Sequence, residues 1–259
     1  MLHSSSGGAP DAVGFSTTVA PESPFQINPD LDLDEISAAY SRDGRVRISG
    51  LLAEGAVALH EYLGARTDWI HLINTDDGIL ELDPDDRARL SAAEWKAITD
   101  QAHQRARTGF QYRYEGLRVP DEGDTDENDL LLAFARLMQS NRMIDLLKKV
   151  TGHEGLAFTD GQATAYGPGD FLTGHDDDVT GKGRTAAYVF GLTPQWRLEW
   201  GGLLLFHGAH DRTATGLSPR FNTLDLFKVP QMHSVSEVTG AAPHRRYAIT
   251  GWLRAGRPD

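Results

Sequence analysis

A histidine and an aspartate stand two positions apart in the segment "GHDDDVTGKGR", residues 174–184. In an extended chain, side chains two apart point to the same side, so His175 and Asp177 can converge on one ion. By the same alternation, Asp176 and Asp178 point the other way and are expected to face solvent or substrate. Such a triplet alone is weak evidence of a metal site, because the polar groups of an acidic turn usually face water. A third ligand is needed.

Another histidine and an arginine later in the chain complete a chemically meaningful set: His233 in "VPQMHSVSEV" and Arg246 in "RRYAITGW". Two histidines and one carboxylate on one face of an octahedron leave three positions open, as in non-haem Fe(II) oxygenases. Two of these positions can take a 2-oxo acid and the third can take O₂. The far carboxylate of a dicarboxylic 2-oxo acid needs a fixed cation, which arginine supplies as a rigid fork. On a strand, Thr250 shares the face of Arg246 and can add a hydrogen bond.

Neighbouring residues offer competing assignments. His207 and His210, in "FHGAHD", have the spacing of a metal pair, but we expect them in a loop after a strand. Arg245 adjoins Arg246, and strand alternation places it on the opposite face. Arg184 is expected to support the loop beside the metal ligands or to touch substrate.

Composition limits the class of protein. The chain has 259 residues, 40% of them hydrophobic, which is enough for one large core. It has no cysteine, so disulfides and thiolate metal sites are excluded. A formal net charge of −12 disfavours nucleic acid and anionic membranes and suits a basic partner. With no long apolar run and no signal sequence at its start, we expect a cytoplasmic protein that binds neither nucleic acid nor membranes directly.

The chain divides into a leader and a globular remainder. Residues 1–24 are rich in Ser, Gly, Ala and Pro and predict a flexible leader, while residues 25–259 are expected to form one domain. Beyond Gly152, short runs of β-forming residues alternate with Gly, Pro, Asn and Asp. This texture predicts an antiparallel sandwich, barrel or jelly roll.

Helices are expected in the first half. The segment 91–107, "SAAEWKAITDQAHQRAR", opens with Ser91 and has Glu94 three positions later, the arrangement of a capping box. The segment "LLLAFARLMQSNRMIDLLKKVTG" predicts one or two helices that end at Gly152. We expect these helices to support a β-core built mostly from the second half.

The ordered run "TAYGPGDFLTGHDDD…GRTAAYVFGLTPQW…WGGLLLF…FNTLDLF…MHSVSEV…RRYAITGW" resembles a known family. It is similar to the prolyl-4-hydroxylase branch of the 2-oxoglutarate- and Fe(II)-dependent dioxygenases, and most of all to its ribosomal-protein prolyl hydroxylases. The resemblance covers about residues 156–254. It implies a mainly β fold with helical support (α+β), in which N-terminal helices buttress a double-stranded β-helix, or jelly roll.

The resemblance also implies a site and its cofactors, which are Fe(II), 2-oxoglutarate, O₂ and, as reductant, ascorbate. By this resemblance the iron ligands are His175, Asp177 and His233, Arg246 binds the C5 carboxylate of 2-oxoglutarate, Tyr166 hydrogen-bonds this co-substrate, and Thr250 is a secondary contact.

The implied reaction hydroxylates a prolyl residue of a protein or peptide while 2-oxoglutarate is oxidatively decarboxylated to succinate. A basic protein of the translation apparatus is one candidate substrate, in keeping with the negative charge of the chain. Three alternatives stay open at this point. The same mechanism can act on a free amino acid or another small metabolite, the chain can be a non-enzymatic metal-binding jelly-roll protein, or it can be a degenerate regulatory oxygenase domain.

Overall fold

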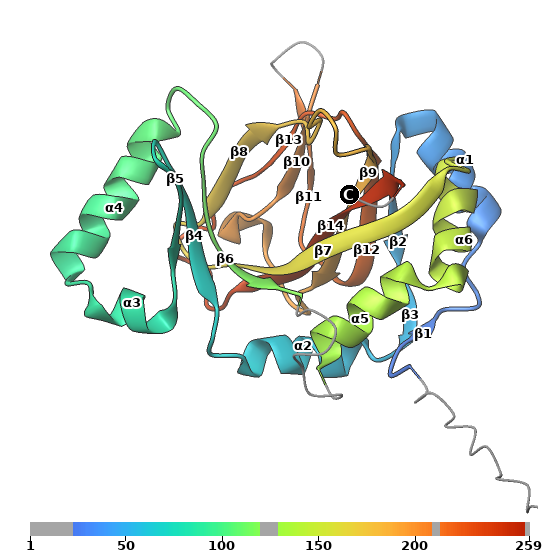
Figure 1. Cartoon of the computed structure of the whole chain (residues 1–259), viewed down its shortest axis with the longest axis horizontal. Helices are drawn as coiled ribbons and strands as arrows, with labels where there is room; N and C mark the ends of the chain where they lie inside the picture. The colour runs from blue at the N-terminus through green and yellow to red at the C-terminus, as the bar shows by residue number, and fades with distance from the viewer. Residues whose placement is uncertain (1–22, 120–128, 209–212, 257–259) are drawn as a thin grey trace, which may run out of the picture.

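The computed structural model describes residues 23–119, 129–208 and 213–256, so most of the predicted leader lies outside the described part. Helices cover one side of a large curled sheet, and a second helical group lies at its edge (Figure 1). Among the described residues the α-helices are α1 (Leu33–Asp43), α2 (Ala56–Ala65), α3 (Pro84–Arg89), α4 (Ala92–Arg105), α5 (Leu130–Gln139) and α6 (Asn141–Thr151).

The strands form a small sheet and a large, mainly antiparallel one. They are β1 (Gln26–Ile27), β2 (Arg45–Ser49), β3 (Leu52–Glu54), β4 (Ile70–Thr75), β5 (Gly78–Leu82), β6 (Tyr112–Arg118), β7 (Leu156–Tyr166), β8 (Phe171–His175), β9 (Arg184–Leu192), β10 (Leu204–His207), β11 (Ala214–Leu217), β12 (Phe221–Lys228), β13 (His233–Val235) and β14 (Arg246–Ala255). The large sheet runs in the order β11-β10-β13-β8-β6-β7-β14-β9-β12-β2, and the hairpin β4–β5 joins it at β6.

This sheet curls into a half-barrel, and its central strands send alternate side chains into different cores. On β9, Tyr188 and Phe190 belong to the core under the helices, whereas Ala187 and Val189 belong to the core inside the curl. On β14, Ile249 likewise faces the helices. A period of two with apolar residues on both faces is typical of a strand covered on both sides. The jelly-roll core with helical support is thus confirmed.

The helix predictions are confirmed in position. Helix α4 begins after Ser91, whose side chain accepts from the backbone N–H of Glu94 while Glu94 accepts from the Ser91 backbone, so the capping box forms. The predicted segment after Asp129 contains two helices, which meet at Ser140. Gly152 ends the second in the left-handed conformation, with φ 72°. Among the described residues, no helix is both long and apolar enough to cross a membrane.

Candidate active site

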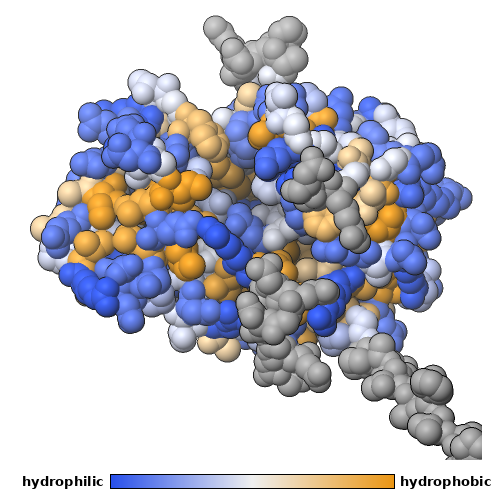
Figure 2. All heavy atoms as spheres, viewed as in Figure 1, coloured by the Kyte–Doolittle hydropathy of each residue, from blue (hydrophilic) through white to orange (hydrophobic). Residues whose placement is uncertain are grey.

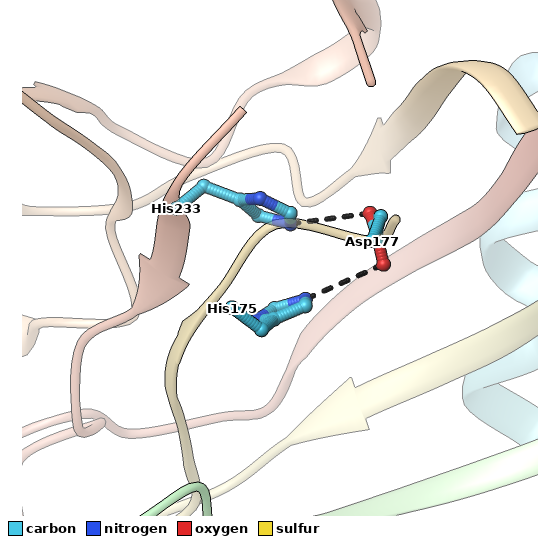
Figure 3. A group of neighbouring side chains, drawn as sticks. All are labelled: His175, Asp177 and His233. Carbon is cyan, nitrogen blue, oxygen red and sulfur yellow. Dashed lines mark ion pairs between the residues drawn. The ribbon is translucent and has the colours of Figure 1, made fainter. Parts of the chain in front are cut away.

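Three side chains meet at the open end of the curled sheet. His175 ends β8 and His233 begins β13, and the two residues are direct partners in the register of these strands. Their ring centroids are 4.1 Å apart. Asp177 places one carboxylate oxygen 3.6 Å from His175 Nε2 and the other 3.5 Å from His233 Nε2 (Figure 3). One ligand atom from each side chain lies within 4.8 Å of the other two, so only small side-chain shifts separate this arrangement from one that holds a shared metal at about 2 Å.

The aspartate reaches this position through a backbone turn. We expected an extended segment in which Asp177 follows strand alternation, but β8 ends at His175, and Asp177 has a φ of 64°. Left-handed backbone is uncommon for residues other than glycine, although aspartate adopts it more readily than most. Arg184 supports the turn by donating from a guanidinium nitrogen to the Asp177 carbonyl oxygen at 3.1 Å. The prediction of convergence agrees with the structure, and its geometric reason was wrong.

Hydrogen bonds to the backbone leave the same nitrogen of each histidine available. His175 Nδ1 lies 3.0 Å from the Thr173 carbonyl oxygen, and His233 Nδ1 lies 2.7 Å from that of Gln231. Because a carbonyl oxygen only accepts, each Nδ1 carries the proton, and each Nε2 lone pair faces Asp177. Burial and the neighbouring His175 lower the pKa of His233 to about 4, so this imidazole is neutral near pH 7. Two imidazoles and a carboxylate are the donor set typical of non-haem Fe(II) oxygenases.

A buried arginine faces the same space without a carboxylate of its own. Arg246 is 5% exposed, and its guanidinium lies 5.2 Å from the ring centroid of Tyr166, its register partner on β7. Among the described residues, no ion pair includes Arg246. The nearby Asp225 is already held by Arg47, with N to O distances of 2.6 and 2.7 Å. A buried cation is costly unless it is paired, so this site fits an anionic group of a bound molecule.

The three candidate metal ligands, Tyr166 and Arg246 line one cavity of about 540 Å³. Thr250 also lines it, on the same face of β14 as Arg246. Near the metal ligands, the Arg184 guanidinium lies 3.6 Å from the ring centroid of Trp252, which forms part of the wall. All six residues singled out in the sequence therefore contact one pocket: Tyr166, His175, Asp177, His233, Arg246 and Thr250.

The competing residues lie elsewhere. Arg245 points away from the cavity and pairs with Glu115 at 2.9 Å, as strand alternation predicts. We expected His207 in a loop, but it is the last residue of β10, where it pairs with Ala214 of β11. Its Nε2 lies 2.8 Å from the Ser234 hydroxyl, so it is not one of the ligands. His210 lies outside the described residues.

Sequence reasoning missed an aromatic wall of this cavity. Phe110, Tyr112 and Tyr114 follow one another at every second position, and Tyr114 stacks on Tyr166 with centroids 5.2 Å apart. Phe110 also contacts His175, at 5.6 Å between ring centroids. The alternation in "GFQYRYEGLRV" predicts a strand, and it also contained the signal for one aromatic face.

Comparison with known proteins extends these observations. A family model described as the 2OG-Fe(II) oxygenase superfamily matches residues 161–254. Prolyl 3-hydroxylase OGFOD1 of Xenopus laevis is 34% identical over 114 residues, which cover 41% of this chain and 22% of that protein. The chain thus spans less than a quarter of the length of this curated relative.

Two solved structures share the fold. A prolyl-4-hydroxylase from Pseudomonas putida has a TM-score of 0.51 and 15% identity, covering 86% of this chain and 98% of that one. A prolyl hydroxylase from Trichoplax adhaerens, solved with a peptide fragment of the oxygen degradation domain of hypoxia inducible factor, has a TM-score of 0.56 and 16% identity. It covers 86% of this chain and 89% of that one.

The fold, the donor set and the family match agree on one class: residues 161–254 are similar to the 2OG-Fe(II) oxygenase superfamily, and the candidate metal ligands lie within that stretch. Fe(II), 2-oxoglutarate and O₂ are the cofactor and co-substrates of that superfamily. Within it, the sequence relative lies in the prolyl hydroxylase branch, so the resemblance seen in the sequence motifs is confirmed.

Proposed function

We propose that this chain is an Fe(II)- and 2-oxoglutarate-dependent dioxygenase that hydroxylates a prolyl residue of a protein or peptide. One observation carries the proposal: Arg246, buried and without an ion-pair partner among the described residues, faces the cavity in which His175, Asp177 and His233 converge. A metal site that only binds metal needs no such cation. A site that binds a dicarboxylic 2-oxo acid on its metal needs both.

Each residue has a definite task in this reaction. His175, Asp177 and His233 would hold the ferrous ion, while Arg246 would bind the C5 carboxylate of 2-oxoglutarate. Burial keeps the pKa of the Tyr166 hydroxyl well above its ordinary value, so the group stays protonated and can donate a hydrogen bond to the co-substrate. When bound, iron and 2-oxoglutarate supply the oxidising chemistry, and the protein supplies orientation and a pocket that limits the access of water.

The mouth of the cavity favours a peptide over a free amino acid. Ile79, Phe110 and Val179 line it from three separate segments, and their exposed fractions are 58%, 50% and 46%. Apolar side chains that gather at one opening are typical of a binding surface. Apolar surface is also concentrated on the side of the molecule that carries α3, α4 and the hairpin β4–β5 (Figure 2). We call Ile79, Phe110 and Val179 the rim. A single amino acid at the metal would leave the rim exposed to water, whereas a bound peptide would extend across it.

The rim also carries negative charge, which supports a basic substrate segment. Asp176 and Asp178 line the mouth beside Val179, and the whole chain has a formal net charge of −12. Opposite charges steer association and fix the register of a bound partner. We therefore include a basic protein of the translation apparatus among the proposed substrates.

Succinate formation from 2-oxoglutarate by the Fe(II)-loaded protein tests the proposal. Proline-containing peptides from ribosomal proteins, variants with the basic residues replaced, and free proline are compared, and products are analysed by mass spectrometry for an added oxygen atom. We expect basic peptides to stimulate turnover and to gain oxygen on proline. Stimulation by free proline alone would support the small-metabolite alternative, and no 2-oxoglutarate binding would leave only a metal-binding jelly roll.

A further inference from the structure

Strand β6 separates two environments. Its residues Tyr112 and Tyr114 line the cavity, whereas Arg113 and Glu115, at the intervening positions, point to the opposite side. Arg113 is 7% exposed and Glu115 is 5% exposed, so both charges are buried directly behind the aromatic wall. The proposed reaction gives neither residue a task, yet burying two charges needs a structural reason.

The first charge fixes the turn that joins β7 to β8. Arg113 Nε donates to a carboxylate oxygen of Asp170 at 2.7 Å, and another guanidinium nitrogen donates to the Pro168 carbonyl at 2.9 Å. The second carboxylate oxygen of Asp170 accepts from the Gly167 backbone N–H at 2.8 Å. This turn follows Tyr166 directly, so the buried ion pair sets where Tyr166 ends its strand.

The second charge fixes the start of β14. Both carboxylate oxygens of Glu115 accept from Arg245, with distances of 2.9 and 3.0 Å. Such a fork restrains orientation as well as distance. Arg245 directly precedes Arg246, which is the register partner of Tyr166. The Glu115–Arg245 pair therefore ends one residue before Arg246, and the Arg113–Asp170 pair reaches Tyr166 through Gly167, whose N–H Asp170 accepts.

We propose that the ion pairs Arg113–Asp170 and Glu115–Arg245 are positioning elements that set Tyr166 and Arg246 for binding of the 2-oxoglutarate C5 carboxylate. This inference rests on the proposed function, because it assigns the co-substrate to Arg246. The Arg113–Asp170 pair is buried on both sides, and such a pair adds little stability over well-packed apolar residues; in the second pair Glu115 is buried and the Arg245 side chain is 41% exposed. Directional geometry is what suits these ion pairs to positioning, because a guanidinium fork that shifts loses one of its two hydrogen bonds to a carboxylate.

Equilibrium binding of 2-oxoglutarate to the Mn(II)-loaded protein, measured by calorimetry, tests the inference without turnover. For Glu115→Gln we expect the dissociation constant to rise about tenfold, as is typical when a group that orients a ligand-binding residue is removed. Because this variant leaves Arg245 without its partner, its melting temperature is measured in parallel. The double variant Glu115→Gln/Arg245→Met removes both charges, so we expect the melting temperature to recover while binding stays weak.

Two controls separate the possible failures. Arg66→Gln breaks a partly buried ion pair with Asp68 after α2, outside the cavity lining, and should leave 2-oxoglutarate affinity unchanged. Arg246→Ala should weaken binding most. Normal binding by Arg246→Ala would overturn the proposed clamp itself. If Arg246→Ala weakens binding but the double variant binds as wild type, the ion pairs are merely structural and only the positioning inference fails.

Discussion

Two regions of the molecule form the cavity and differ in what they contribute. Residues 161–254 supply all the proposed ligands of metal and co-substrate, and this stretch is the one that matches the superfamily. Residues 70–118 lie outside the match, yet they supply the hairpin, the aromatic wall and Ile79 at the rim. Under the proposed function, the core would determine the reaction type, whereas residues 70–118 would contact the substrate at the mouth of the cavity.

The largest effect is expected from a change in the core. His233→Ala removes a ligand, and turnover should fall more than about a hundredfold, since loss of groups that merely orient ligands already costs 10–100-fold. Succinate formation measures this. His207→Ala is the matched control on the neighbouring strand and should keep its activity. Equal losses in both variants would show that the ligand assignment is wrong.

A milder change in the core should act on the co-substrate alone. Arg246→Lys keeps the charge but loses the planar fork, so the KM for 2-oxoglutarate should rise by about 10-fold, the value of one charged hydrogen bond. The KM for peptide should change little. Titration of succinate formation with each substrate gives both constants, and unchanged 2-oxoglutarate dependence would place the clamp elsewhere.

A change in residues 70–118, before the core, should affect binding of the peptide and not binding of the co-substrate. Phe110→Ala removes an exposed ring from the rim, and the peptide KM should rise about fivefold, equivalent to ~1 kcal/mol. Succinate formation without peptide should not change. Leu198→Ala, at a residue 64% exposed and outside the cavity lining, is the matched control. If both variants bind peptide equally well, the two regions do not divide the work as described.

The smallest effect is expected at the capping box of α4. Ser91→Ala removes the side chain that accepts from Glu94, which should lower the free energy of unfolding by about 1 kcal/mol. Denaturant unfolding measures the loss. Both KM values should stay at wild-type levels, because Ser91 lies outside the cavity lining. If the peptide KM rises in this variant, helix α4 also contributes to peptide binding.

Much of the fold follows from local sequence signals. The capping box at Ser91 and the glycine at 152 locate helix ends because they satisfy backbone groups locally. Alternation on β14 correctly separates Arg246 from Arg245, since a strand has a fixed period of two. The family resemblance supplied the jelly-roll core and the set of residues expected at its site.

Long-range contacts could not be predicted from these signals. The hairpin β4–β5 is a partner of β6, and its place at the cavity mouth depends on pairing between segments distant in sequence. Asp177 lies in a left-handed turn beyond the end of β8 and its carbonyl accepts from Arg184, a contact that no local pattern encodes. The buried role of Glu115 was also invisible, because a charged residue in a strand ordinarily faces water.

The direct pairing of His175 with His233 has a consequence for assembly of the sheet. Strand β13 is three residues long and its register with β8 rests on few backbone pairs. A slip by one residue would turn His233 to the other face and separate it from Asp177. An ion bound by these side chains would therefore cross-link Asp177 to His233 across a long loop of the chain. It would stabilise only the native register. Metal supply would then govern how firmly this end of the sheet is closed, as well as whether the proposed reaction can occur.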